Sequence, residues 1–272
     1  MKVPGWEQYR WLLHGFSTRA GGVSSVYGQS TLNLGWTKED DPANVAENRR
    51  RFLEAVDGEN RGHTLVGIRQ VHSGIVRIIR ESNGVLEGQL QTLEGKAVLE
   101  GDGLITNLPD VLLGVGTADC VPVLLVDTEK RVVAALHAGW RGTVARIAES
   151  GVAAMAEEFG SRPKDMVAAI GPSIGACCYT VGEEVRDNFR KFQYADKLFS
   201  SKADDIRLNL WEANRRQLMD AGIDSERITV LGECTACSRD GNGQLRFFSH
   251  RGEKGVAGRM LNIIGIKSAD FR

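Results

Sequence analysis

The sequence predicts a mixed α/β fold in which layered β-sheets are flanked by helices, within a single compact domain spanning residues 1–272. Segments with helical and strand periodicity alternate along the chain, yet several strands follow one another directly. Glycine accounts for 32 of the 272 residues and has no fixed period, which is typical of many tight turns between short strands. No Pro/Ser-rich linker, long charge run or internal repeat divides the chain.

The first predicted helix begins at Asp41-Pro42. Aspartate caps a helix N-terminus and proline favours the first helical position, and apolar residues follow at helical spacing. The next segment, residues 64–80, is rich in β-branched residues with alternating polarity and is interrupted near His72. This pattern predicts a strand, a turn and a second strand.

The middle of the chain predicts strands that are buried on both faces. Residues 111–127 form two nearly continuous apolar runs, separated by residues 117–120. Residues 131–136 predict a further strand, and the glycine-containing residues 137–142 predict a turn. Residues 143–159 then carry apolar side chains at helical spacing, so we expect one helix there.

The last predicted elements are a strand and a helix. Residues 165–170 predict a strand that ends at the Gly171-Pro172 breaker. Asn209 followed by Glu212 three residues later is the pattern of a capping box, and Gly222 is expected to close the helix that begins there.

Composition excludes several classes of protein. The 34 Lys and Arg against 35 Asp and Glu give a net charge of −1, so the chain lacks the broad basic field that nucleic-acid binding requires. No apolar run approaches the length of a membrane span, and the N-terminus lacks the pattern of a signal peptide. Five cysteines, an odd number, do not predict a disulfide framework. We therefore expect a cytoplasmic protein that binds neither nucleic acid nor membrane.

Three residues at breaks in apolar strands are candidate metal ligands. His72, Cys120 and His137 each lie where a predicted strand gives way to a turn. Two imidazoles and a thiolate are a suitable ligand set for Zn²⁺, with a fourth position left for water or substrate. Their separations of 48 and 17 residues suit a site assembled from several strand ends. From spacing alone, a buried cysteine and two unrelated histidines remain an equal alternative.

The same residues also fit a cysteine hydrolase. In that hypothesis Cys120 is the nucleophile, His137 or His72 is the base, and Asp119 or backbone amides orient the site. A metal ligand and a nucleophile both require a thiolate, so the sequence leaves the two open. A third hypothesis is a non-catalytic protein that binds a metal or a partner.

Two further residues are candidates for binding substrate. Arg141 adjoins the expected start of a helix, where the amides of Gly142 and Thr143 could bind phosphate or carboxylate. The alternative is that Arg141 is solvated and the glycines only form the turn. Asn33 lies in a glycine-containing loop, where it is either a site residue or a turn former.

The Cys234-Thr-Ala-Cys237 motif is a weaker metal candidate. A structural zinc site built on C-x-x-C needs a second pair, and the other two cysteines, Cys177 and Cys178, are adjacent in sequence. We therefore interpret these cysteines as packing residues.

The order and content of eight motifs resemble the YfiH/YlmD family, whose members are also labelled polyphenol oxidase or laccase-domain proteins, and are most similar to its bacterial YlmD branch. The resemblance runs from about Ser17 to Met260. The motifs are Ser17-Thr-Arg-Ala-Gly-Gly-Val-Ser24, Thr31-Leu-Asn-Leu-Gly35, Asp41-Pro42 through Asn48-Arg49, Gln70-Val-His72, Gly101-Asp-Gly-Leu-Ile-Thr106, Thr117-Ala-Asp-Cys120, His137-Ala-Gly-Trp-Arg-Gly142 and Gly171-Pro-Ser-Ile-Gly-Ala-Cys-Cys-Tyr179.

This resemblance implies a single α/β domain with a zinc site made by His72, Cys120 and His137. It also implies a zinc-dependent purine nucleoside enzyme that carries out phosphorolysis of adenosine, inosine and methylthioadenosine to the free base and (methylthio)ribose 1-phosphate, with adenosine deaminase activity. The expected partners are purine nucleosides and phosphate, with a homodimer left open. Arg141 would then hold phosphate, and Asp119 would accept a proton.

Two details qualify the resemblance. The family's usual glycine after Q-V-H is Ser73 here, and the C-terminal loop at residues 249–259 departs from the family pattern.

The number of histidines in the chain excludes a true multicopper laccase, which the older label of the family would suggest. A blue-copper centre alone takes two His and a Cys, and the three remaining histidines of the chain cannot furnish a trinuclear cluster as well. Cu²⁺ could still occupy the same three ligands in place of Zn²⁺.

Overall fold

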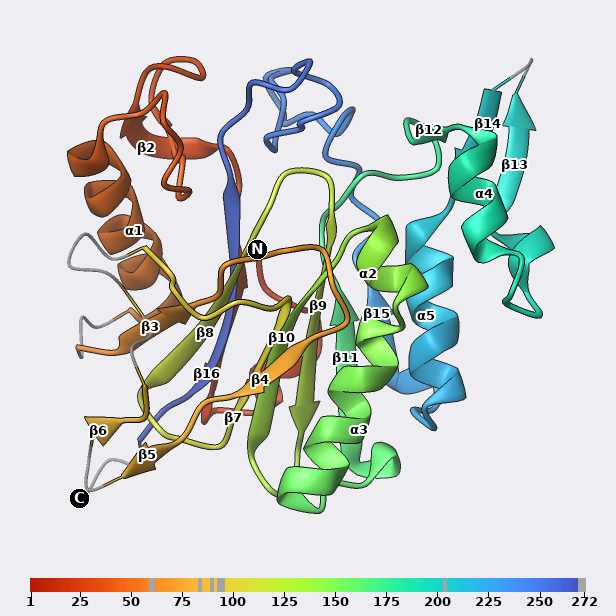
Figure 1. The fold of residues 1–272 in the computed structure, drawn as a ribbon. Coiled ribbons are helices and arrows are strands. Elements are labelled where there is room, and N and C mark those ends of the chain that lie inside the picture. Colours follow the sequence, from red (N-terminus) through yellow and green to blue (C-terminus); the bar gives the residue numbers. More distant parts are fainter. Residues whose placement is uncertain (59–61, 83–84, 89–90, 92–95, 203–204, 269–272) are drawn as a thin grey trace.

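In the computed structural model of the protein, the chain forms four layers in the order helix, sheet, sheet, helices (Figure 1). The structure describes residues 1–58, 62–82, 85–88, 91, 96–202 and 205–268. The helices are α1 Pro42–Asp57, α2 Trp140–Val144, α3 Ile147–Phe159, α4 Glu183–Phe189 and α5 Leu210–Asp220, with short 3₁₀ helices at Trp6–Gln8, Pro163–Asp165, Ala195–Lys197 and Ser225–Arg227.

Two sheets form the middle layers. The first has four strands in the order β1-β16-β8-β3, and the second has six in the order β15-β11-β9-β10-β7-β4. Two small sheets, β12-β14-β13 and β5-β6, lie at the periphery. The strands are β1 Leu12–Phe16, β2 Ala20–Ser24, β3 Thr64–Gly67, β4 Val76–Ile78, β5 Glu81–Ser82, β6 Val85–Leu86, β7 Gly103–Thr106, β8 Val111–Thr117, β9 Val121–Asp127, β10 Val132–Ala138, β11 Met166–Ile170, β12 Thr180–Val181, β13 Phe199–Lys202, β14 Asp205–Leu208, β15 Ile228–Val230 and β16 Met260–Ile266.

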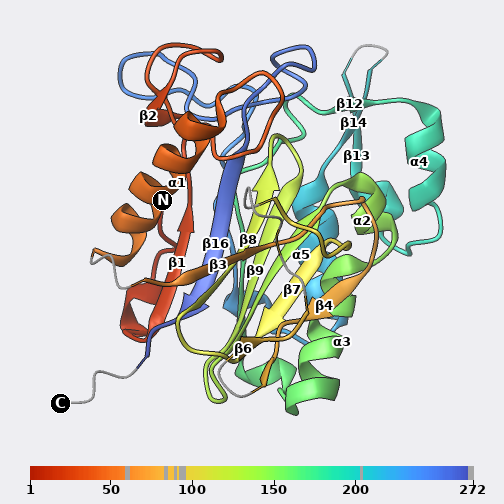
Figure 2. The same ribbon diagram turned by 60° about the vertical axis from the view of Figure 1, so that its left-hand side comes forward.

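The helices cover the outer faces of the two sheets. Helix α1 packs on the four-stranded sheet, and α3 and α5 pack on the six-stranded sheet (Figure 2). Between the sheets lies a core to which both contribute apolar side chains. Among the described residues, no helix combines the length and apolar character needed to cross a bilayer.

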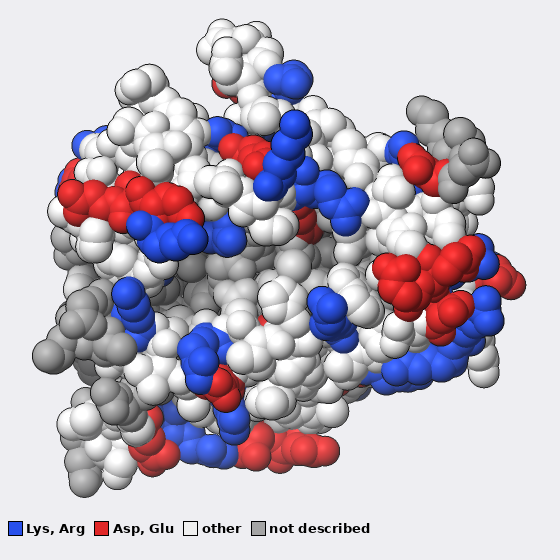
Figure 3. All heavy atoms as spheres, turned by 45° about the horizontal axis from the view of Figure 1, so that its top comes forward, with Lys and Arg blue, Asp and Glu red and all other residues white. Residues whose placement is uncertain are grey.

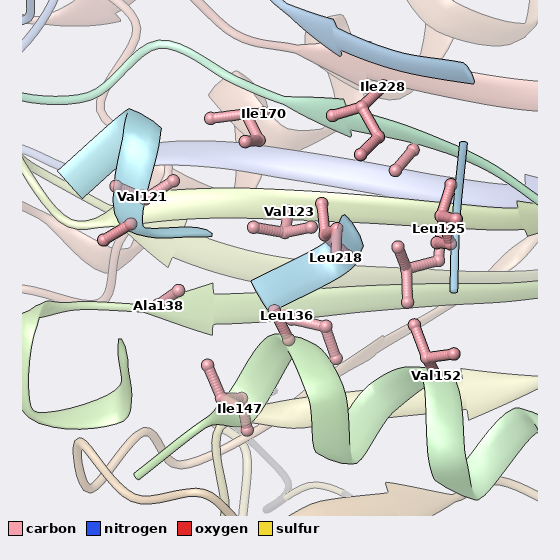
Figure 4. Packing of buried hydrophobic residues seen from close by; sticks show 14 of the residues in the cluster. Val121, Val123, Leu125, Leu136, Ala138, Ile147, Val152, Ile170, Leu218 and Ile228 are labelled. Carbon is pink, nitrogen blue, oxygen red and sulfur yellow. The ribbon is translucent and has the colours of Figure 1, made fainter. Parts of the chain in front are cut away.

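The sequence of strand β9 is continuously apolar because both faces of the strand are buried. Val121, Val123 and Leu125 face the helices α3 and α5, in the core shown in Figure 4. Leu124 and Val126 face the other sheet. Successive residues of a strand point to opposite faces, so a strand between two packed layers needs an apolar residue at every position. The prediction of strands buried on both faces is confirmed.

Replacement of Leu125 by alanine is expected to lower the free energy of unfolding by about 2–5 kcal/mol, because the fully buried side chain would leave a cavity in the core. Urea denaturation followed by circular dichroism measures the change. Val85→Ala is the matched control, since Val85 is 69% exposed and its truncation should change stability by about 0.5 kcal/mol or less. A similar small loss for both variants would contradict the layered core.

The caps of two predicted helices are confirmed. Asp41 Oδ1 accepts a hydrogen bond of 2.8 Å from the amide of Ala43, and α1 ends at Gly58 in the left-handed conformation. Asn209 Oδ1 accepts from the amide of Glu212 at 3.1 Å. The reciprocal half of this capping box does not form, because the amide of Asn209 donates to a carbonyl of the preceding segment.

The single helix expected over residues 143–159 is wrong. The chain instead forms α2 and α3, which are separated at Arg146, whose φ of 60° is left-handed. Two side chains of α5 stabilise the break: Gln217 Nε2 donates to the carbonyl of Thr143 at 2.7 Å, and Asn214 Nδ2 donates to its hydroxyl at 3.1 Å. These partners come from a distant part of the chain, so helical periodicity alone did not reveal the break.

The structure also corrects the expected turn at residues 137–142. Strand β10 continues to Ala138, so His137 lies inside the strand and α2 follows after one residue, Gly139. The two strands expected within residues 64–80 form, but they belong to different sheets, as do the two within residues 111–127. Each interruption is therefore a crossing between layers and not a hairpin.

Candidate metal centre and active site

Strand register brings the three candidate ligands to one end of the six-stranded sheet. His137 pairs with Pro122 of the antiparallel strand β9, so Cys120, two residues before Pro122, lies beside it. Strand β7 begins at Gly103 at this same end, and β4 runs parallel to it, which places the turn containing His72 there too. This is the upper end of the sheets in Figure 1.

The donor atoms of the three residues converge. One ring nitrogen each of His72 and His137 and the Sγ of Cys120 all lie within 4.8 Å of one another. Cys120 Sγ is 4.0 Å from His72 Nε2, and the two imidazole rings lie edge to face with centroids 5.0 Å apart. In a tetrahedral zinc site the ligand atoms are about 3.3–3.8 Å apart, so a small contraction would fit the ion. His137 is buried and His72 is exposed, so solvent can reach the group of three ligands from the side of His72.

A buried carboxylate that the sequence analysis did not single out orients this group. Asp102 is fully buried, and its Oδ1 lies 2.8 Å from His137 Nδ1. The same carboxylate accepts hydrogen bonds from the amide of His72 at 3.0 Å and from the hydroxyl of Ser73 at 2.7 Å. A hydrogen bond from Nδ1–H to a carboxylate fixes the tautomer that leaves Nε2 available as a ligand. Asp102 thereby connects both histidine segments.

The glycines on either side of Asp102 are the sequence feature that could have identified it as a site residue. Gly101 has a φ of 153°, and a Cβ there would lie 3.0 Å from the carbonyl oxygen of Ile75. A Cβ on Gly103 would lie 2.8 Å from the side chain of Leu136. The backbone can pass this close to its neighbours only without side chains, so the Gly-Asp-Gly sequence positions the carboxylate.

Electrostatics favour a charged pair in the metal-free site. Burial opposes ionisation of Cys120, but the neighbouring His137 outweighs it and lowers the pKa of the thiol to about 6. Burial likewise opposes protonation of His137, but the Cys120 thiolate and the Asp102 carboxylate raise its pKa to about 9. Desolvation disfavours the charged form of Asp102, yet its hydrogen bonds from His137 and Ser73 hold its pKa below the usual value. The thiolate is thus present at neutral pH, as both metal binding and nucleophilic attack require.

The three residues lie in a cavity of about 740 Å³, within the range of about 300–1,000 Å³ usual for small-molecule sites. Its walls include two aromatic side chains, Trp36 and Tyr179. Burial raises the pKa of Tyr179 to about 12, so its phenol is neutral. Figure 3, which turns this end of the molecule forward, shows a hollow with Lys and Arg side chains around it. The basic residues that line the cavity are Arg49, Arg69, Lys96, Arg251 and Arg259.

Two of these arginines flank the loop at Leu34-Gly35. Arg49 Nε donates to the carbonyl of Leu34 at 2.9 Å, and its guanidinium lies 4.8 Å from the centre of the Trp36 ring. Burial lowers the pKa of Arg49 to about 10, so it remains a cation at neutral pH. The stem of Arg259 packs so closely on Gly35 that a Cβ there would lie 2.6 Å from it. The cavity therefore has a cationic wall that is fixed by backbone contacts.

Asp119 lines the cavity, and its carboxylate is held by several hydrogen bonds. Its Oδ1 accepts hydrogen bonds from the hydroxyls of Thr235 at 2.7 Å and Ser249 at 2.6 Å, and its Oδ2 accepts from the amide of Arg251 at 2.6 Å. Both oxygens are thus engaged with the C-terminal segment. The structure supports Asp119 as an anchor for the residues around Arg251, which is a different role from the expected proton acceptor.

The other two sequence candidates lie outside this cavity. Asn33 is fully buried, and its amide group bonds to Asp40, Gly35 and the amide of Arg259, so it is a structural residue of its loop. Arg141 lines a neighbouring hollow, and its guanidinium lies 4.3 Å from the centre of the Trp140 ring. Of the amides expected to bind an anion beside Arg141, that of the buried Thr143 donates to the carbonyl of Gly139 at 2.8 Å, so the anion site there stays a prediction that rests on Arg141 and Gly142.

The structure brings the adjacent cysteines Cys177 and Cys178 beside the C-x-x-C motif, so a second pair exists in three dimensions although the sequence has no second C-x-x-C. The sulfur atoms of Cys177, Cys178, Cys234 and Cys237 all lie within 4.8 Å of one another. The loop that follows β11 carries the first two and the loop that follows β15 carries the others, and these strands pair in parallel. Sequence spacing gave no sign of this meeting.

Comparison with known proteins agrees with the fold. The family model described as multi-copper polyphenol oxidoreductase laccase matches residues 13–267. The purine nucleoside phosphorylase YlmD of Bacillus subtilis is 35% identical over 261 residues, which cover 95% of this chain and 90% of that protein. The adenosine deaminase RL5 of an unknown prokaryotic organism is 37% identical, covering 87% of each chain. The crystal structure of a Bacillus licheniformis hypothetical protein YfiH superimposes with a TM-score of 0.84 at 36% identity, covering 97% of this chain and 94% of that one.

Proposed function

The chain belongs to the multi-copper polyphenol oxidoreductase laccase family, which includes YfiH and YlmD, and from this premise we propose that it is a zinc-dependent purine nucleoside phosphorylase with adenosine deaminase activity. Its substrates would be adenosine, inosine or methylthioadenosine together with phosphate. The relatives named as purine nucleoside phosphorylase and adenosine deaminase support an enzyme of this kind. We place it in the cytoplasm, where its five free cysteines would stay reduced.

The observation that carries the proposal is the convergence of His72, Cys120 and His137 in the lining of a cavity that also has cationic and aromatic walls. The donor set of two imidazoles and one thiolate fits Zn²⁺, and Asp102 supplies the carboxylate that zinc-binding histidines usually contact. When bound there, zinc would supply a Lewis acid with one position open towards the cavity.

Phosphorolysis requires a phosphate oxygen to attack the anomeric carbon of the ribose while the bond to the purine breaks and its electrons pass to the base. Arg49 and Arg259 could hold the phosphate dianion, because guanidinium groups bind phosphate through charge-assisted hydrogen bonds. Trp36 and Tyr179 line the cavity and could give the purine aromatic contacts beside Arg49 and Arg251, which lie over their rings. The cavity would thus orient both substrates beside the three ligands.

Replacement of Arg49 by glutamine is expected to raise the KM for phosphate in phosphorolysis by about 10- to 100-fold, because a charge-assisted hydrogen bond contributes about 1.5–3 kcal/mol. Adenosine deamination uses water in place of phosphate and should change much less. Steady-state rates of both reactions in the same variant measure the difference. Arg141→Gln is the control, since Arg141 lies in the neighbouring hollow and should alter neither KM. Equal losses in both activities of Arg49→Gln would count against a phosphate role, as would a larger effect of Arg141→Gln.

Zinc dependence itself is tested by removing the metal. Turnover of adenosine with phosphate should disappear after treatment with a strong chelator and return when Zn²⁺ is added back. Cu²⁺ could occupy the same ligands, so a parallel addition of Cu²⁺ tests which ion supports turnover. A protein that contains zinc but converts no nucleoside would favour the non-catalytic hypothesis.

A cysteine hydrolase is the second candidate, and the pairing of Cys120 with His137 is the observation that favours it. In that case activity would survive chelation, and iodoacetamide would inactivate the metal-free enzyme by labelling Cys120. A multicopper laccase is not supported, because His14 and His63 bond to Val3 and Asp57 away from the cavity. Of the remaining histidines, His250 lines the cavity.

A further inference from the structure

Four cysteines meet on the side of the molecule next to the candidate active site. Strands β11 and β15 run in parallel, so the loops that follow them leave the sheet at the same edge. The two loops are joined there by backbone hydrogen bonds: the amide of Ser173 donates to the carbonyl of Glu233 and the amide of Thr235 donates to the carbonyl of Ser173, both at 3.1 Å. The first loop carries Cys177 and Cys178, and the second carries Cys234 and Cys237. We call these four residues the cysteine cluster.

The sulfur atoms of the cysteine cluster are arranged around a common centre. All four lie within 4.8 Å of one another, and those of Cys177 and Cys237 are 3.7 Å apart. Four sulfurs at the zinc–sulfur distance of about 2.3 Å from one ion lie about 3.8 Å from each other in a tetrahedron. An iron–sulfur cube would hold the cysteine sulfurs farther apart, because its iron and sulfide atoms lie between them. The observed spacing suits a single ion.

The surrounding backbone is also built for this arrangement. The amide of Gly175 donates to Cys234 Sγ at 3.3 Å, a contact that partly offsets the charge of a thiolate ligand. A Cβ on Gly175 would lie 3.2 Å from Cys177 Sγ and 2.8 Å from the ring of Trp211 on α5, so only glycine lets the first loop pass between this sulfur and the helix. Arg207 donates a hydrogen bond to the carbonyl of Cys177 and brings a cation beside the cluster.

We propose that Cys177, Cys178, Cys234 and Cys237 form a second metal site, a tetrathiolate that holds one structural Zn²⁺. It is separate from the site at His72, Cys120 and His137, and together the two sites use every cysteine of the chain. With Zn²⁺ and four thiolates the site would carry a net charge of −2, which suits a position with two exposed residues and a neighbouring arginine.

The bound ion would join the two loops and so fix one wall of the active-site cavity. Tyr179 follows Cys178 directly, and Thr235 follows Cys234 and donates to the Asp119 carboxylate. Arg251 bonds to the carbonyl of Thr180 at 2.6 Å and lies over the ring of Tyr179. Without the ion, these residues would depend on the backbone contacts alone.

The first test uses the Cys120→Ser variant, because it leaves only the four thiols of the cluster in the chain. Protein purified under reducing conditions should retain one zinc per chain by elemental analysis. Titration with an organomercurial reagent should release that zinc with a chromophoric chelator as detector, and release should be complete at four equivalents. Replacement by Co²⁺ should give the visible spectrum of a tetrahedral tetrathiolate site. Zinc-free protein, iron in place of zinc, or disulfides detected in place of free thiols would overturn the proposal.

The second test removes the cluster and keeps the other site. Wild-type protein should contain two zinc ions per chain, and Cys177→Ser/Cys237→Ser should contain one, with a lower melting temperature and faster proteolysis at residues 171–180 or 232–240. His72→Ala should instead lose the other ion and keep the cobalt tetrathiolate spectrum. Because these readouts measure metal and not turnover, they stand even if the proposed nucleoside activity is absent. An unchanged zinc content in the double variant would contradict the site.

Discussion

Replacement of Cys120 by serine is expected to abolish measurable phosphorolysis and deamination and to remove one zinc per chain. Serine is a poor zinc ligand at neutral pH, because its hydroxyl stays protonated where the thiol of Cys120, with a pKa of about 6, is ionised. Residues that only orient a metal ligand cost about 10- to 100-fold when replaced, so loss of a ligand itself should cost more. Nucleoside turnover and elemental analysis of the same preparation measure both effects.

The control for Cys120→Ser is the double variant that lacks two residues of the cysteine cluster. Cys177→Ser/Cys237→Ser should keep the zinc held by His72, Cys120 and His137, so the two variants separate the two ions. Circular dichroism shows whether Cys120→Ser is folded. If this variant lost all activity while its zinc content stayed unchanged, Cys120 would act as a nucleophile and the cysteine hydrolase hypothesis would replace ours.

Replacement of Asp102 by asparagine is expected to weaken zinc binding at the candidate active site by about 10- to 100-fold and to reduce both activities. The amide cannot accept from His137 Nδ1–H, the amide of His72 and the hydroxyl of Ser73 with the strength of a carboxylate. The favoured tautomer of His137 is then lost, and two of the three ligands become less ordered. Competition with a zinc chelator of known affinity measures the change.

Asp119→Asn is the matched control for Asp102→Asn. Asp119 is also buried and also accepts several hydrogen bonds, but its donors are Thr235, Ser249 and the amide of Arg251 and not a histidine. Zinc affinity should therefore be little changed in this variant, although the wall of the cavity that includes Arg251 is expected to loosen. Equal zinc affinities in Asp102→Asn and wild type would show that Asp102 is not needed to orient His137.

Local features of the chain could be predicted because the interactions that produce them are local. The cap of α1 at Asp41 involves residues two apart, and the apolar run of β9 reflects burial of each strand face by whatever layer packs on it. His72, Cys120 and His137 could be singled out because each lies at or near a break in a run of apolar residues that predicts a strand. Their ligand chemistry is carried by residue type, so the candidate set could be formed before their distances were known.

The break between α2 and α3 could not be predicted in this way. The side chains that stabilise it, Asn214 and Gln217, lie more than 70 positions along the chain from Thr143. The same holds for the arginines that we propose to bind phosphate. Arg141 is close in sequence to His137 but lies in another hollow, whereas Arg49 and Arg259 come from opposite ends of the chain and line the cavity.

The fold class, the alternation of buried faces and the types of residue able to bind a metal could all be inferred from the amino-acid sequence alone. The contact of Asp102 with His137, the anchoring of the C-terminal segment by Asp119, and the meeting of two cysteine pairs in one cluster arise only in the folded chain. Each of these contacts depends on the register of strands such as β11 and β15, whose pairing brings together residues separated by tens of positions. Hydrophobic periodicity specifies which face of a strand is buried but not which strand lies beside it, so contacts of this kind follow from the complete packing of the chain.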